Sequence, residues 1–191
     1  MSQSHVLSLN KLSKRFGSVV ANNGVSLKLV KGEVLALLGE NGAGKTTLMN
    51  MLFGHYLPDS GSIDVADELG VMHPLTLGHP QAALDSGIGM VHQHFTLAEN
   101  LTVLENIIIG EQSLLSFSLP QKSARKKLRD LSDRFGLPID PDAIVANLTV
   151  SEKQRLEILK TLYRECTLLI LDEPTAALTP QETDSLFSTM K

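Results

Sequence analysis

Gly39-Glu40-Asn41-Gly42-Ala43-Gly44-Lys45-Thr46 is the stretch that decides the fold. A glycine, four further residues, and then Gly-Lys-Thr form the pattern of a phosphate-binding loop. Glycine reaches backbone conformations that other residues avoid, so successive N–H groups can turn toward phosphate oxygens. The pattern therefore predicts a loop that holds the phosphates of a nucleotide, followed by a helix whose N-terminus faces them.

The residues on either side of the loop support this prediction. Residues 34–38 form a continuous apolar run, Val-Leu-Ala-Leu-Leu, as expected of a strand buried on both faces. Residues 45–53 predict a helix that Gly54 ends. A strand, a glycine-rich loop and a helix in this order are the context that the motif needs.

The loop residues have expected chemical roles. Lys45 would reach the β- and γ-phosphates and so counts as a catalytic residue, and the hydroxyl of Thr46 would bind Mg²⁺. The predicted cofactors are a nucleoside triphosphate and Mg²⁺. The candidate nucleotide-binding residues of this segment are Gly39, Glu40, Asn41, Gly42, Ala43, Gly44, Lys45, Thr46 and Thr47.

A second apolar strand, predicted at residues 167–171, ends in the acidic pair Asp172-Glu173. Ligands of open α/β sheets bind at the carboxyl ends of the strands, so this pair is expected near the phosphates. Asp172 is a candidate Mg²⁺ ligand, acting through water. Glu173 is the candidate general base that polarises the attacking water.

The rest of the chain predicts an α/β protein with a mainly parallel central sheet. Residues 6–9 and 25–29 alternate apolar and polar side chains, which predicts two antiparallel, half-buried strands. We expect an edge strand at 63–65 and a further strand at 88–92. The pattern is helical from about 97 to 163, which predicts an inserted helical subdomain, with Ser151 as the N-cap of its last helix.

Composition excludes several classes of function. The chain has 191 residues, of which 42% are hydrophobic and 20% charged, which is typical of a globular protein. Its formal charge of −4 gives no basic excess for a nucleic-acid partner. No apolar run reaches the ~18 residues of a membrane span, so any role at a membrane would be exercised from outside the bilayer.

With these motifs in place, the chain resembles the nucleotide-binding subunits of ATP-binding cassette (ABC) transporters, in the bacterial sugar and nucleoside importer branch. The resemblance covers almost all of residues 5–188, and its most specific stretches are residues 89–95, 155–160 and 172–180. It implies a P-loop NTPase (RecA-like) core with an antiparallel β-subdomain and an inserted helical subdomain. It also implies that two such cassettes sandwich two ATP molecules head to tail.

The resemblance assigns roles that the residues alone do not reveal. Gln93 matches the glutamine that touches Mg²⁺ and the attacking water in the family, so it is both a catalytic and a metal-binding candidate. Phe16 matches the aromatic residue that stacks on adenine. Without the resemblance, Gln93 would be an ordinary polar residue after a strand, and Phe16 would be assigned to the core.

The signature segment departs from the family pattern Leu-Ser-Gly-Gly-Gln. The aligned residues are Leu148, Thr149, Val150, Ser151 and Glu152, and the last four are the candidates for contact with the partner cassette's ATP. Ser151 replaces a glycine, so the shared site is either weakened or merely altered. Thr179 stands where many members of the family carry an aspartate.

The resemblance further implies an importer for a sugar, nucleoside or similar small solute, with residues 90–95 favouring a nucleoside. The implied partners are a second cassette, permease subunits and, indirectly, an extracytoplasmic solute-binding protein, at the cytoplasmic face of the membrane. The sequence stops at Lys191, before the family's switch histidine. We therefore expect residues 1–191 to be an N-terminal cassette that is incomplete at its C-terminus and hydrolyses ATP weakly or not at all by itself.

Three other classes of function are compatible with a phosphate-binding loop. A soluble ABC ATPase of DNA repair or the ribosome would carry long coiled-coil insertions or basic arms, and none is visible in this sequence. A GTPase would carry an Asn-Lys-x-Asp segment, which is absent from the sequence. A small-molecule kinase would need an arginine-rich lid over the phosphates.

Overall fold

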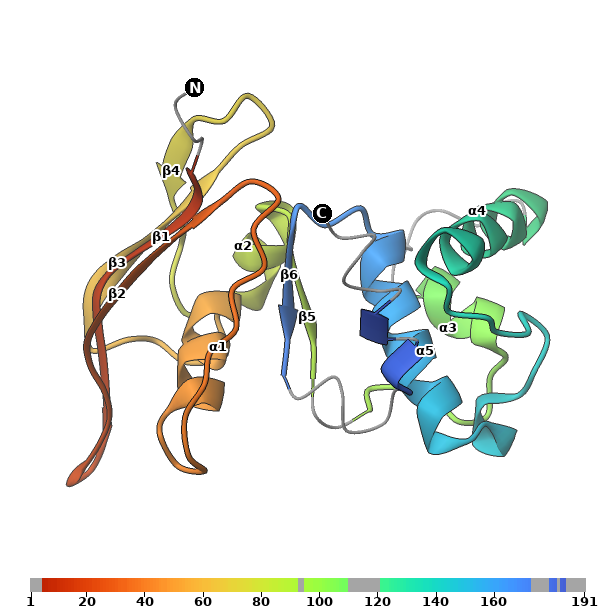
Figure 1. Cartoon of the computed structure of the whole chain (residues 1–191), viewed down its shortest axis with the longest axis horizontal. Coiled ribbons are helices and arrows are strands. Elements are labelled where there is room, and N and C mark those ends of the chain that lie inside the picture. The colour runs from red at the N-terminus through yellow and green to blue at the C-terminus, as the bar shows by residue number, and fades with distance from the viewer. Residues whose placement is uncertain (1–4, 93–94, 110–120, 173–178, 182, 185–191) are drawn as a thin grey trace. The chain divides into compact units, whose positions relative to one another are not determined.

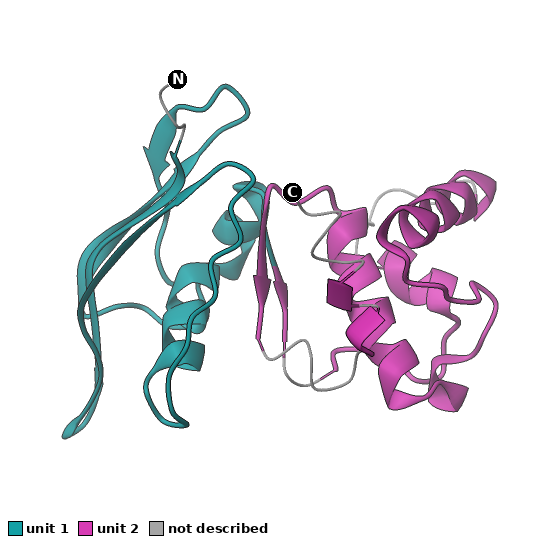
Figure 2. Ribbon diagram, viewed as in Figure 1, with its two compact units in different colours: residues 1–89, 191 teal, residues 90–190 magenta. Residues whose placement is uncertain are grey.

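The computed structural model describes residues 5–92, 95–109, 121–172, 179–181 and 183–184. The chain divides into two compact units, one of residues 1–89 with residue 191 and one of residues 90–190 (Figure 2). Each unit is described by itself below. Gln93 and Glu173, two of the predicted catalytic residues, lie outside the described residues.

Unit 1 is built on a four-stranded antiparallel sheet in the order β2-β1-β3-β4 (Figure 1). Its strands are β1 (His5–Phe16), β2 (Val19–Val30), β3 (Ser60–Ala66) and β4 (Met72–Pro74). The predicted antiparallel pair at 6–9 and 25–29 is confirmed, because Leu7 of β1 pairs with Leu29 of β2. Both of these leucines are buried, as the alternating pattern requires.

The prediction that residues 63–65 form an edge strand is wrong. They belong to β3, which pairs with β1 on one side and β4 on the other. The edge strand on this side of the sheet is β4, and its three residues are too few to give a periodic pattern. The carboxylate of Asp67 turns the chain between these strands by accepting the N–H groups of Leu69 and Val71, both at 2.9 Å.

Two helices lie on one side of this sheet, α1 (Lys45–Phe53) and α2 (Pro80–Asp85) (Figure 1). The predicted bounds of α1 are confirmed, and Gly54 ends it in the left-handed conformation with φ 91°. A Cβ at Gly54 would approach the backbone carbonyl carbon of His79 to 2.7 Å. Glycine is therefore required at this position by both conformation and packing.

The prediction of a buried strand at residues 34–38 is wrong. No strand is present there, and the side chain of Leu38 is 92% exposed. A strand needs a neighbour for its backbone hydrogen bonds, and within the described residues none pairs with this run. The apolar residues are those expected of a buried strand, but the sequence pattern does not show whether a neighbouring strand is present to pair with them.

Unit 2 contains most of the helices and a two-stranded sheet. Its helices are α3 (Val103–Ile109), α4 (Gln121–Phe135), the 3-10 helix η1 (Val145–Asn147) and α5 (Val150–Tyr163). β5 (Ile88–Val91), which begins in unit 1, pairs with β6 (Leu168–Leu171), and the two arrows point the same way (Figure 1). These two strands were predicted, whereas the limits of the helical subdomain at 97 and 163 stay a prediction.

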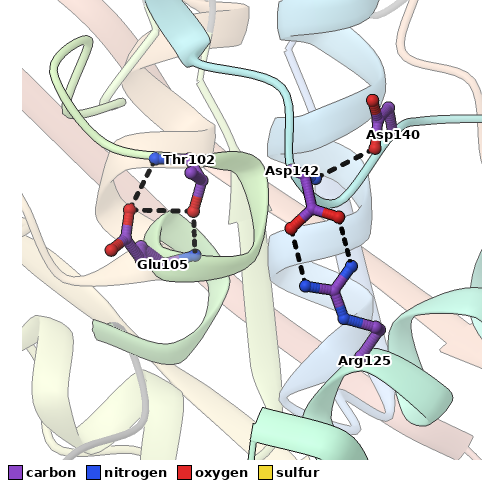
Figure 3. Close-up of polar contacts among 5 residues, drawn as sticks. All are labelled: Thr102, Glu105, Arg125, Asp140 and Asp142. Atoms are coloured by element: carbon purple, nitrogen blue, oxygen red, sulfur yellow. Dashed lines mark hydrogen bonds and ion pairs between the residues drawn. The ribbon is translucent and has the colours of Figure 1, made fainter.

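Helix caps and ion pairs fix the helices of unit 2. Thr102 and Glu105 exchange hydrogen bonds at the start of α3, with the N–H of Thr102 donating to Glu105 Oε2 over 2.7 Å (Figure 3). Arg125 of α4 donates two hydrogen bonds of 2.6 Å to the carboxylate of Asp142, which ties α4 to the segment before η1 (Figure 3).

The predicted N-cap of the last helix is wrong by two positions. Thr149, not Ser151, caps α5, because its hydroxyl accepts the N–H of Glu152 while Glu152 Oε2 accepts the N–H of Thr149 over 2.8 Å. This reciprocal pair is a capping box, which satisfies two backbone donors together. Ser151 therefore lies inside α5, which begins at Val150.

The core of unit 2 is one apolar cluster beneath these helices. Val91, Leu128, Leu156 and Leu159 are fully buried within it. Among the described residues, none of the helices has the length and apolar character needed to pass through a lipid bilayer.

Candidate functional site

The phosphate-binding candidate is the loop that ends at the first residue of α1. Gly44 is the N-cap of α1 in the left-handed conformation, with φ 85°, and its carbonyl accepts the N–H of Leu48 over 2.9 Å. Within the loop, the N–H of Ala43 donates to the carbonyl of Glu40 over 3.1 Å. By sequence, the first turn of α1 carries no acidic side chain, so nothing in it repels an anion at this positive end of the helix.

Gly44 fits only because it lacks a side chain. A Cβ there would lie 2.2 Å from the carbonyl oxygen of Ala21 and 3.0 Å from the side-chain nitrogen of Asn22. Both of these residues belong to β2, which thus packs against the loop at Gly44. A loop backbone held this closely keeps its N–H groups in place for a ligand, which fits a bound phosphate chain.

Lys45 lies over the loop that precedes it. Its ammonium donates to the carbonyl oxygens of Gly39 and Glu40 over 2.7 and 2.9 Å. The cation is therefore held at the loop by acceptors that phosphate oxygens could replace. Thr46, the predicted Mg²⁺ ligand of this segment, is exposed in the first turn of α1.

Phe16, the predicted adenine platform, ends β1 in the same unit as the loop. Its side chain is 46% exposed, so it is not a core residue. An exposed aromatic face in a unit that also carries a phosphate loop can stack on a nucleotide base.

Asp172 follows directly after β6. Its N–H donates to the carbonyl of Val91 at the end of β5, over 3.2 Å, and it is half-buried. Val91 precedes Gln93 by two residues in the sequence. Thr46 and Asp172 belong to different units, and their joint role at Mg²⁺ therefore stays a prediction.

The signature candidates form the start of α5. Thr149 and Glu152 are engaged in the capping box, and Val150 is exposed. The hydrogen bonds from the Thr149 N–H and hydroxyl lower the pKa of the Glu152 carboxyl below its ordinary value. The Glu152 carboxylate therefore orders the N-terminus of this helix.

Two residues that sequence reasoning missed hold these segments in place. Asn22 of β2 contacts the loop at Gly44, as its side-chain nitrogen donates to that carbonyl over 3.3 Å. Glu157 of α5 is 3% exposed, and its carboxylate accepts the N–H and hydroxyl of Thr96, which follows Gln93 by three residues in the sequence. The sequence signal that could have identified Glu157 is its position as an acidic residue between the apolar residues Leu156, Ile158 and Leu159, which are buried.

Comparison with known proteins places these features in context. The family model described as "ABC transporter" matches residues 22–176. The chain is 48% identical over its whole length to the nucleoside import ATP-binding protein NupA of Lactococcus lactis subsp. cremoris. It is also 48% identical, over 98% of its length, to the guanosine import ATP-binding protein NupO of Bacillus subtilis. The chain spans 37% and 36% of the lengths of these two relatives.

More distant similarity extends to a sugar importer and to solved structures. The glucose import ATP-binding protein TsgD13 of Haloferax volcanii is 42% identical over the whole chain, which spans 39% of that protein. A nucleotide-free ATP-binding cassette from an ABC transporter superposes with a TM-score of 0.79 at 25% identity, over 96% of this chain and 75% of that one. A cassette in its ADP conformation gives a TM-score of 0.80 at 25% identity, over 97% and 75%.

Proposed function

The chain belongs to the ABC transporter family, and on that premise we propose that it binds MgATP and belongs to the ATP-hydrolysing subunit of an importer. One observation carries the proposal most strongly. The ammonium of Lys45 lies on the carbonyls of Gly39 and Glu40, at the N-terminus of a helix whose cap only glycine can occupy. This arrangement provides a cation and the N–H groups of a helix N-terminus for a phosphate chain.

The nucleotide would be held by three sets of residues. Residues 39–47 surround the phosphates, and Phe16 stacks on the adenine. Thr46 would bind Mg²⁺ through its hydroxyl, Asp172 through water and Gln93 through its amide oxygen, since Mg²⁺ prefers oxygen ligands. The bound Mg²⁺ would neutralise charge on the phosphate oxygens.

Hydrolysis assigns three further roles to residues of this chain. Glu173 accepts a proton from the water that attacks the γ-phosphate, and Gln93 orients that water. Lys45 stabilises the negative charge on the transferred phosphoryl group. Each of these roles requires a charged or polar side chain at the carboxyl end of a strand or in the phosphate loop, where the sequence places them.

The proposed partners follow from an ATP site that is shared between two cassettes. Residues 149–152 at the start of α5 would contact the ATP of a second cassette, in the same polypeptide or a second copy. Permease subunits would carry the solute, and an extracytoplasmic binding protein would deliver it. The subunit would then work as a peripheral protein at the cytoplasmic face of the membrane.

A nucleoside is the solute class that we favour. The two relatives at 48% identity are named for nucleoside and guanosine import, whereas the glucose importer stands at 42%. A sugar is the other candidate, because the same kind of subunit serves both. None of the relatives described above is named for a role outside import, which would be the mark of a soluble ABC ATPase.

Hydrolysis can be tested with Glu173→Gln in the full-length protein. Replacing the carboxylate by an amide removes the base but keeps the shape, so we expect ATP affinity within about twofold of wild type and turnover reduced by about 10² or more. Calorimetry measures the first quantity and phosphate release the second. Sustained turnover in this variant would assign the base to another residue.

The solute class can be tested by uptake. In cells that lack the gene, labelled nucleoside uptake should be restored by the wild-type protein and not by Lys45→Ala. If ribose uptake required the wild-type protein and nucleoside uptake did not, the subunit would belong to a sugar importer instead.

A further inference from the structure

The loop after α1 is attached to the end of β1 by several polar contacts. The N–H of Asp59 donates to the carbonyl of Ser13 over 2.9 Å, and the N–H of Arg15 donates to Asp59 Oδ2 over 2.7 Å. The ammonium of Lys14 donates to the carbonyl of Leu57 over 2.8 Å and to Asp59 Oδ1 over 3.0 Å. The hydrogen bonds from Lys14 and Arg15 lower the pKa of Asp59, and the one from Lys14 is the largest cause. The loop therefore has a fixed position beside Phe16.

This loop presents the ring of Tyr56 to the ring of Phe16. The ring centroids are 5.4 Å apart and the ring planes are inclined by 73°, which is an edge-to-face contact. The two side chains are 41% and 46% exposed, so the contact leaves part of the Phe16 ring open. The backbone of Tyr56 is itself anchored, because its N–H donates to the carbonyl of Asn50 in the last turn of α1 over 3.1 Å.

An exposed phenylalanine at the end of a strand changes rotamer unless contacts restrain its ring; here Tyr56 contacts the ring of Phe16, and the Lys14 ammonium lies 5.5 Å from its centroid. A contact that fixes the ring before a ligand arrives reduces the entropy lost on binding. Helix α1 thus serves the predicted nucleotide at both ends, with Lys45 in its first turn and the support of Tyr56 at its last.

We infer that Tyr56 is a positioning residue for the nucleotide base: its ring holds Phe16 in the orientation that stacks on adenine. The inference rests on the proposed nucleotide site and extends it to a residue that no motif identifies. Tyr56 acts through Phe16, so its contribution is confined to the base and does not extend to the phosphates.

The test compares MgATP with magnesium tripolyphosphate, which has the phosphate chain but no base. Titration calorimetry on the 191-residue chain measures both affinities for wild type, Tyr56→Ala, Tyr56→Phe and Leu57→Ala. Leu57→Ala is the matched control, because it truncates an exposed neighbour and keeps the carbonyl that binds Lys14. Tyr56→Leu replaces Tyr56→Ala if thermal unfolding shows that the alanine variant does not fold.

Tyr56→Ala should weaken ATP binding about fivefold, the size expected of one lost aromatic contact, and leave tripolyphosphate binding within about twofold. Tyr56→Phe and Leu57→Ala should bind ATP like wild type. Unchanged ATP affinity in Tyr56→Ala, an equal loss for both ligands, or failure of Tyr56→Phe to restore affinity would overturn the inference. A wild-type chain that binds neither ligand would instead contradict the nucleotide site and the inference together.

Discussion

Asn22 of β2 is bonded to Gly44 at the start of α1: its side-chain nitrogen donates to the Gly44 carbonyl over 3.3 Å. The same carbonyl accepts the N–H of Leu48, so it is shared between the sheet and the helix. Asn22 is buried, and Ala21 beside it leaves no room for a Cβ on Gly44. The antiparallel sheet and the phosphate loop are thereby joined at one glycine, which links the strand pair that carries Phe16 to the residues expected to hold phosphate.

This close approach predicts a difference between two glycines of one loop. Gly42 and Gly44 have φ of 88° and 85°, so alanine is similarly strained by conformation at either position. The Cβ of Gly44→Ala would meet Ala21 O at 2.2 Å, whereas that of Gly42→Ala meets nothing within 4 Å. We expect Gly44→Ala to lose about 2 kcal/mol more unfolding free energy than Gly42→Ala, since overpacking adds to the strain. Urea unfolding measures both, and equal losses would show that β2 does not restrain the loop.

The buried carboxylate of Glu157 gives a second prediction. It accepts the N–H of Thr96 and, over 3.0 Å, the hydroxyl of the same residue. Glu157→Ala leaves a part-buried N–H without an acceptor, which should cost about 2–3 kcal/mol of unfolding free energy. Glu157→Gln keeps an acceptor oxygen and should lose roughly half as much. Denaturant unfolding compares the two variants, and an alanine variant as stable as wild type would remove Glu157 from this role.

Acid should weaken the start of α5 through Glu152. The pKa of its carboxyl is lowered in the folded chain, chiefly by the backbone N–H of Thr149, so the unfolded chain takes up a proton first as the pH falls. The stabilisation is then complete above about pH 4.3, the ordinary value for glutamate, and is lost as the pH falls through the lowered value.

The melting temperature measured from pH 7 to pH 3 checks this sign. Wild type should lose more stability than Glu152→Gln below about pH 4.3, because glutamine has no proton to take up. Glu105, whose pKa is lowered by the N–H of Thr102, should behave in the same way. Parallel curves for wild type and Glu152→Gln would mean that the capping box does not respond to pH.

How far the sequence predicts the fold depends on whether a signal is local. The bounds of α1 could be predicted because Gly44 and Gly54 lie immediately outside it, and glycine is the residue that both caps require. The strand at 34–38 could not be decided in this way, because burial depends on neighbours from elsewhere in the chain. The cap of α5 was misplaced although the spacing of Thr149 and Glu152 contains the capping-box pattern.

The same difference between local signals and long-range contacts applies to the candidate site. The phosphate loop is a contiguous motif, and the helix that it predicts is confirmed at Lys45. Tyr56 and Asn22 act through contacts between segments far apart in the sequence, and neither has a local signature. Gln93 and Glu173 remain predictions from motif and family, as they lie outside the described residues.

The central claim is that residues 39–46 bind the phosphates of ATP, and Lys45→Ala tests it most directly. Lys45 donates to the loop carbonyls of Gly39 and Glu40 and is the cation expected to meet the β- and γ-phosphates. Calorimetric titration of MgATP into the wild-type chain and the Lys45→Ala variant should show affinity reduced by more than about tenfold, or roughly 1.4 kcal/mol. Equal affinities in a folded variant would show that this loop is not the nucleotide site.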